Sequence, residues 1–191
     1  QRVDSGNGAL PAAKKKSKLV SLHEEDTRIS KCSMLHLSET SIRCGVEGSK
    51  AEAEFSLVER DLKIAASLNA HVHLGHISSA ESVRLIRKAK KRGQSVSAEI
   101  TPHHAHLTVE DAEKLPLEKL SLFKVCPPIR ESADRDQLRK GVLDGSIDCF
   151  ASDHAPHSIF EKNLPLDLAM HGIVGLEYFF SLYNELRLQT R

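Results

Sequence analysis

The sequence predicts an α/β fold with a parallel sheet, and two observations carry this prediction. Short apolar segments alternate four times with helical patterns along the 191-residue chain. Such alternation is typical of parallel strands joined by helical crossovers. Each apolar segment is also followed directly by ionisable side chains. These positions share one edge of a parallel sheet, where α/β enzymes usually keep their chemistry.

The predicted strands span residues 19–22, 70–75, 95–100 and 147–150, and we expect the last one to be buried. The ionisable side chains that follow them are His23, His76, His103 and Asp153. We expect these four groups to converge although they are far apart in sequence. A (β/α) barrel arranges its site in this way, but it needs eight strands. The four pairs of strand and helix predicted here are half of such a barrel.

The predicted helices connect these strands. Residues 51–68 carry one apolar stripe at helical spacing, and Ser78 with Glu81 is a capping-box pattern that predicts the start of the next helix. Later helices are expected through residues 138–143 and over residues 172–188. Residues 27–50 show no period and are expected to form a long loop. We predict one incomplete barrel domain over residues 1–191, with residues 1–17 a linker or helix remnant.

The composition is that of an ordinary soluble protein. A net charge of +1 gives no reason to expect a nucleic-acid or membrane partner, and we expect a small-molecule substrate. The four cysteines, at positions 32, 44, 126 and 149, show no CxxC spacing and are expected to be free thiols, which favours the cytoplasm. The chain begins at Gln1 without Met, which is expected of an internal piece of a longer protein.

Imidazoles together with a carboxylate are ligands suited to Zn²⁺ or a similar divalent ion. The spacing alone therefore suggests a metal-assisted hydrolase. At each single position the alternative is an ordinary turn residue, and His71 and His73 are read as packing or surface residues. Four such clusters at equivalent positions strengthen the metal hypothesis.

The segment Ala151-Ser152-Asp153-His154-Ala155-Pro156-His157, followed by Lys162, resembles the C-terminal signature of dihydroorotases, which are metal-dependent amidohydrolases. Other segments resemble the same family. They are Leu22-His23-Glu24-Glu25-Asp26, His76-Ile77-Ser78-Ser79, residues 98–104, Pro127-Pro128-Ile129-Arg130 and residues 172–177. The resemblance covers nearly the whole chain from Leu19 onward.

The resemblance implies a partial TIM (β/α)₈ barrel, with this chain supplying strands five to eight. It implies reversible hydrolysis of L-dihydroorotate to N-carbamoyl-L-aspartate in pyrimidine biosynthesis, with one or two zinc ions in the complete enzyme. His23 and His76 would be zinc ligands. Asp153 would be both a zinc ligand and the catalytic acid/base. Substrate-binding roles would fall on Cys126, His157, His171 and Gly172.

Two departures from the family pattern stand out. The family has Asn just before the Pro-Pro pair, where this chain has Cys126, and a thiol cannot replace the paired hydrogen bonds of an amide. The first-strand His-x-His pair, its associated Arg and the fourth-strand metal ligand would all precede Gln1. We therefore expect either a missing N-terminal half of the barrel or a second copy as partner.

Two other functions remain open from the sequence. One is a related cyclic amidohydrolase of the hydantoinase or allantoinase kind. The other is a truncated homologue without catalytic activity, which Cys126 and the absent half favour. Whether this chain is active alone is also left open.

Overall fold

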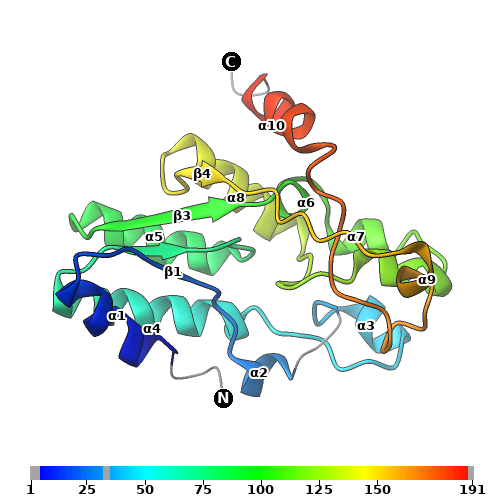
Figure 1. The fold of residues 1–191 in the computed structure, drawn as a ribbon. Coiled ribbons are helices and arrows are strands. Elements are labelled where there is room, and N and C mark those ends of the chain that lie inside the picture. The colour runs from blue at the N-terminus through cyan, green and yellow to red at the C-terminus, as the bar shows by residue number, and fades with distance from the viewer. Residues whose placement is uncertain (1–4, 32–34, 189–191) are drawn as a thin grey trace.

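The computed structural model describes residues 5–31 and 35–188, and in this part of the chain four strands form one parallel sheet (Figure 1). Its order is β1-β2-β3-β4, so the strands lie side by side in chain order. The strands are β1 (Val20–Leu22), β2 (Val72–Leu74), β3 (Val96–Ile100) and β4 (Cys149–Phe150). The predicted α/β class with a parallel sheet is confirmed.

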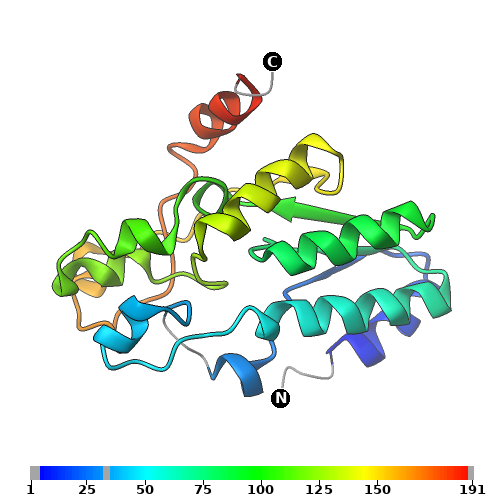
Figure 2. The same ribbon diagram turned by 180° about the vertical axis from the view of Figure 1, so that it is seen from behind.

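Three long helices cover one face of the sheet, as the reverse view in Figure 2 shows. They are α4 (Glu52–Leu68), α5 (Ala80–Lys91) and α8 (Ser132–Leu143). Val72 and Leu74 of β2 point toward these helices and are fully buried, whereas His73 between them points to the opposite face. Side chains alternate between the two faces of a strand, so β2 and β3 each present one apolar and one polar face.

The core follows from the helical spacing seen in the sequence. Val58, Leu62 and Ala65 lie on one stripe of α4, and all three are buried against the sheet. Burying one such Val or Leu side chain stabilises the fold by about 1.5–3 kcal/mol. The helix ends at Asn69, which adopts a left-handed conformation with φ of 46° and lets the chain turn back into β2.

Two expectations about local structure were wrong. Helix α5 starts one residue later than the Ser78–Glu81 pattern predicts, because Ser79 is the N-cap and accepts a hydrogen bond from the Ser82 N–H. The Ser78 hydroxyl instead donates to the buried carboxylate of Glu54. Strand β4 is exposed rather than buried, because it lies at the edge of the sheet.

Two predicted regions differ in extent from the structure. The expected loop over residues 27–50 contains two short helices, α2 (Thr27–Ser30) and α3 (Glu39–Arg43). The last helix, α10 (Phe179–Leu188), begins seven residues later than expected, and residues 172–178 lie outside any helix. Near the start of the described chain, α1 (Ser5–Lys15) packs on α4, and its Leu10 is fully buried.

Short elements gather where the strands end (Figure 1). They are α6 (Pro102–His106), α7 (Val109–Ala112), the 3₁₀ helix η1 (Leu117–Phe123) and α9 (Ile159–Lys162). Within the described ranges, no helix has both the length and the apolar character needed to cross a bilayer. The ends of the parallel strands therefore form a rim of short segments that carry most of the ionisable side chains discussed below.

Candidate metal centre

Each strand of the sheet is followed by one ionisable side chain of the group singled out in the sequence. His23 comes directly after β1, and His76 comes two residues after β2. His103 and Asp153 each come three residues after their strands, β3 and β4. Because the strands are parallel, these four positions share the edge formed by the carboxyl ends of the strands.

The imidazoles of His23 and His76 face one another. The His23 Nδ1 lies 2.8 Å from the His76 Nε2, and the ring centroids are 4.6 Å apart. Burial lowers the pKa of His76, and the neighbouring His23 lowers it further. His76 is therefore neutral at neutral pH, the state in which an imidazole can bind a metal ion.

Asp153 lies next to His103 at the other side of this edge. Its Oδ2 is 3.6 Å from the His103 Nε2. The His103 ring lowers the pKa of Asp153, and charge interactions with His76 and His23 lower it further. The carboxylate therefore stays ionised at neutral pH. It lies close enough to the imidazoles of His76 and His23 for them to lower its pKa.

Unpaired buried nitrogens show that this edge fits a cation. Among the described residues, the His76 Nδ1 and both ring nitrogens of His103 are buried without a hydrogen-bond partner. Burying such a group unpaired costs about 1–3 kcal/mol. His76 and Asp153 also have positive φ angles, 31° and 43°, which non-glycine residues rarely adopt. Neutral imidazoles beside an ionised carboxylate form a donor set suited to a divalent ion such as Zn²⁺.

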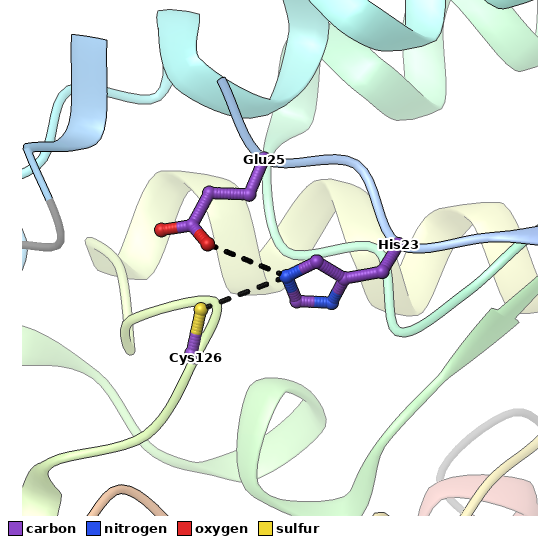
Figure 3. Close-up of side chains that lie close together, drawn as sticks. All are labelled: His23, Glu25 and Cys126. Atoms are coloured by element: carbon purple, nitrogen blue, oxygen red, sulfur yellow. Dashed lines mark hydrogen bonds and ion pairs between the residues drawn. The ribbon is translucent and has the colours of Figure 1, made fainter. Parts of the chain in front are cut away.

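The other nitrogen of the His23 ring faces a second pair of side chains (Figure 3). The His23 Nε2 lies 3.5 Å from the Glu25 Oε2 and 3.8 Å from the Cys126 Sγ. The interaction with His23 lowers the pKa of Glu25 to about 2, and hydrogen bonds from Ser30 and Cys126 contribute. Burial raises the pKa of the Cys126 thiol, and the Glu25 carboxylate raises it further.

The remaining predicted substrate residues lie on the segments that follow Asp153. The His157 Nε2 donates to the His171 carbonyl oxygen at 2.9 Å, and the Gly172 N–H donates to the Lys124 carbonyl oxygen at 2.9 Å. His157 and Gly172 line a mainly apolar cavity of about 660 Å³, and His103 of the strand-end edge lines it as well. Cys126 does not line this cavity.

Lys162, part of the signature, supports the loop rather than presenting a free charge. Its Nζ donates to the carbonyl oxygens of Lys124, Met170 and Gly172 at 3.0–3.3 Å. Burial lowers the pKa of Lys162 to about 8, and the nearby Lys124 contributes. The side chain thus joins three backbone segments around Gly172.

Glu99 and Glu25 are the residues of this region that sequence reasoning assigned no role. The Glu99 carboxylate accepts from the His76 N–H at 3.2 Å and contacts the His73 Nε2 at 3.0 Å. It thereby holds the turn that carries His76. A charged residue inside the strand 96–100 was the available signal. For Glu25 the signal was its position two residues after His23 in a strand-end cluster.

No family model matches the chain, but curated relatives do. Dihydroorotase of Staphylococcus epidermidis is 42% identical over 174 residues, which are 91% of this chain and 40% of the relative. Dihydroorotase of Elusimicrobium minutum is 37% identical over 182 residues, which are 95% of this chain and 41% of the relative. The chain thus spans about two fifths of the length of these relatives.

Solved structures with a similar fold include hydantoinases and a dihydroorotase. The D-hydantoinase (dihydropyrimidinase) from Thermus sp. matches with a TM-score of 0.80 and 19% identity, over 100% of this chain and 43% of that one. The dihydroorotase from Saccharomyces cerevisiae, in complex with 5-fluoroorotic acid, matches with a TM-score of 0.70 and 19% identity, over 99% and 50%. At such identities the structural likeness shows the fold alone.

Proposed function

We propose that this chain, a homologue of dihydroorotases over most of its length, is the metal-binding half of a cyclic amide hydrolase. The reaction would be the reversible hydrolysis of L-dihydroorotate to N-carbamoyl-L-aspartate. The observation that carries the proposal is the placement of His23, His76, His103 and Asp153 after four consecutive parallel strands. In the complete barrel these would be strands five to eight.

His23, His76 and Asp153 are the proposed ligands of Zn²⁺. Zinc in such a site supplies Lewis acidity, which polarises a carbonyl group and makes water more acidic. The lowered pKa values of His76 and Asp153 support this donor set, because they leave neutral imidazole and ionised carboxylate at neutral pH.

Asp153 is the proposed acid/base. Its ionised carboxylate would take a proton from the water whose oxygen attacks the ring carbonyl carbon. As the carbon–nitrogen bond of the cyclic amide breaks, the same carboxyl group would return that proton to the leaving nitrogen. His103, 3.6 Å away, would hold the carboxylate in position and keep it ionised before the attack.

Substrate would bind where the Asp153 loop meets the segment around Gly172. His157, His171 and the Gly172 backbone surround this position, and Cys126 lies across from it beside His23. A thiol is a weak donor and acceptor, so we propose that Cys126 weakens binding of the pyrimidine ring relative to an amide side chain. Because the chain spans only part of its relatives, the rest of the barrel would come from the same longer protein or from a second molecule. The proposed setting is the cytoplasm.

The test supplies the missing part of the barrel. The N-terminal segment of the Staphylococcus epidermidis dihydroorotase that precedes the matched region would be fused to this chain or added separately. We expect zinc-dependent hydrolysis of L-dihydroorotate, with hydantoin turned over more slowly. Asp153→Asn should lower kcat by about a thousandfold, since it removes the proton carrier. The matched control is Asp136→Asn at an exposed position of α8, which should leave kcat unchanged.

Each other result has a definite meaning. Near-normal turnover by the Asp153→Asn variant would remove Asp153 from its role. Faster turnover of hydantoin would favour a hydantoinase-type enzyme. A folded complex that hydrolyses neither substrate would indicate a homologue without catalytic activity.

A further inference from the structure

We propose that His23, Glu25 and Cys126 (Figure 3) form a second divalent-metal site, selective for ions that favour thiolate. This site uses the His23 Nε2, whereas the Nδ1 of the same ring faces His76. The three side chains come from two distant parts of the chain, the segment after β1 and the turn before Pro127. The proposal does not require the proposed hydrolase activity, because it needs no substrate and uses neither Asp153 nor His76, but it shares His23 with the first site.

The two separations from the His23 Nε2 match those of a tetrahedral site. Zinc bonds of about 2.1 Å to nitrogen or oxygen and about 2.3 Å to sulfur place the ligand atoms about 3.4 Å apart for nitrogen and oxygen and about 3.6 Å apart for nitrogen and sulfur. The observed separations from the His23 Nε2 are 3.5 Å to Glu25 and 3.8 Å to Cys126. All three atoms lie within 4.8 Å of one another.

The chemistry of the three groups suits Zn²⁺, Cd²⁺ or Co²⁺. Thiolate, imidazole and carboxylate are all zinc ligands, and the thiolate favours soft or borderline ions over Mg²⁺ and Ca²⁺. On binding, the Cys126 S–H bond breaks, the sulfur–metal bond forms and the proton passes to solvent. The His23 side chain is 40% exposed, so an ion can reach the position from solution.

The two nitrogens of His23 link this site to the edge that faces His76. When the Nε2 binds a metal ion, the ring proton resides on the Nδ1, which can donate it to the His76 Nε2 at 2.8 Å. A metal ion held by the His23 Nδ1 would instead need the ring proton on the Nε2. Occupancy of one position therefore disfavours occupancy of the other, and a thiophilic ion bound at Cys126 would act as an antagonist of the first site.

A second thiol-containing cluster on the open face of the sheet is the natural comparison. His73, Glu99 and Cys149 also lie within 4.8 Å of one another. There, however, the His73 Nε2 and the Glu99 Oε2 are 3.0 Å apart and already paired, and the Cys149 thiol points to the Ala98 carbonyl oxygen at 3.8 Å. In that cluster the contact between imidazole and carboxylate is shorter than the 3.5 Å between His23 and Glu25, whereas the two thiol contacts are equal at 3.8 Å. A metal ion entering the sheet-face cluster must therefore separate a closer pair.

The test is a titration of the reduced full chain with Co²⁺ alone, followed by ultraviolet absorption. A thiolate bound to Co²⁺ gives an intense charge-transfer band, and we expect this band to saturate at one equivalent. Cys126→Ser and Cys126→Asn should both abolish the band. Glu25→Gln should weaken the apparent affinity by about tenfold. Variants of the other thiols, Cys32→Ser, Cys44→Ser and Cys149→Ser, are the matched controls and should keep it.

Circular dichroism of each variant separates loss of the site from loss of the fold. A chain that gives no charge-transfer band with Co²⁺, or one whose band survives in both Cys126 variants, would overturn the proposal. Loss of the band in Cys149→Ser alone would assign the site to the sheet face instead. Asp153→Asn should keep the band, so failure of the catalytic assignment and failure of this site give different results.

Discussion

His36 shows how strongly a single buried ring responds to its surroundings. Burial lowers its pKa to about 4, and the Arg130 guanidinium contributes, with its Nη1 3.2 Å from the His36 Nδ1. Arg130 is itself buried and donates to the Ser78 hydroxyl, which in turn contacts the Glu54 carboxylate. The neutral state of His36 is therefore part of a buried polar network that joins distant segments of the chain.

This network predicts a loss of stability in mild acid. In the unfolded chain His36 has its ordinary pKa of 6.5. Between pH 6.5 and about 4 the unfolded chain therefore binds a proton that the folded chain does not, and stability falls as the pH is lowered. The contribution of His36 is at most about 1.4 kcal/mol per pH unit.

His36→Gln should reduce this slope, because glutamine does not titrate. The measurement is the urea midpoint at several pH values from 7 to 4.5 for both proteins. His71→Gln on the exposed surface is the control and should keep the wild-type slope. Identical slopes for wild type and His36→Gln would show that the ring is not held neutral by the fold.

At the residue scale, position in the chain was enough to predict the strand-end side chains but not their other contacts. His23, His76, His103 and Asp153 follow from the repeated order of strand and ionisable residue. The contact between His23 and Cys126 joins positions 103 residues apart, and no local pattern encodes it. Only the folded arrangement of the Pro127 turn brings that thiol to the ring.

At the element scale, the segment from Gly172 to Leu176 lies against the loop that carries Asp153. The two segments form a bridge between His154 and Ile173, and the Ala155 N–H donates to the Ile173 carbonyl oxygen at 3.1 Å. Gly172 has φ of 147°, and a Cβ there would lie 2.4 Å from the Ala155 carbonyl oxygen. A glycine is therefore required for the two segments to approach this closely.

Gly172→Ala should destabilise the chain by about 2 kcal/mol, because alanine both strains the backbone and separates the two segments. The measurement is the free energy of unfolding in urea. Gly8→Ala is the control: its Cβ meets nothing within 4 Å, and alanine favours the helix α1 in which it lies. If both substitutions left the stability unchanged, the close approach at Gly172 would not hold in solution.

Helix starts and ends were predictable only where one local signal dominated. The apolar stripe of α4 predicted that helix to within a residue. The start of α5 was misplaced because Ser78 and Ser79 are equally good caps in sequence. Glu54 accepts from both hydroxyls and both backbone N–H groups, so it does not distinguish them. Their difference comes from Arg130, whose Nε donates to the Ser78 hydroxyl at 2.9 Å, while the Ser79 hydroxyl accepts from the Ser82 N–H. Tertiary partners therefore chose between two locally equivalent starts.

At the scale of the whole molecule, the sheet has two unpaired edges within the described chain, β1 and β4. Such edges offer backbone groups to other strands. The exposure of β4 follows from this order and could not be predicted from its apolar sequence, because a strand of the same composition is buried when another strand pairs with it.

The open edges predict weak self-association. We expect the sedimentation coefficient of the chain to rise with concentration, because edge strands can pair between molecules. Ser21→Lys places a charge at the exposed centre of β1 and should reduce the association. Ser67→Lys on the exposed surface of α4 is the control and should not. A sedimentation coefficient independent of concentration would contradict this prediction.

The alternating character of the sheet also limits what can cover its open face. The helix side is filled by apolar side chains, whereas the opposite side presents His73, Ser97 and Glu99, already linked by hydrogen bonds at 2.8–3.0 Å. A segment that packs over this side must supply matching donors and acceptors or leave room for water, because an apolar surface would leave the remaining polar atoms without hydrogen-bond partners. A space enclosed between this polar face and covering segments would hold water. The side chains that line this space from the covering segments would then be polar as well.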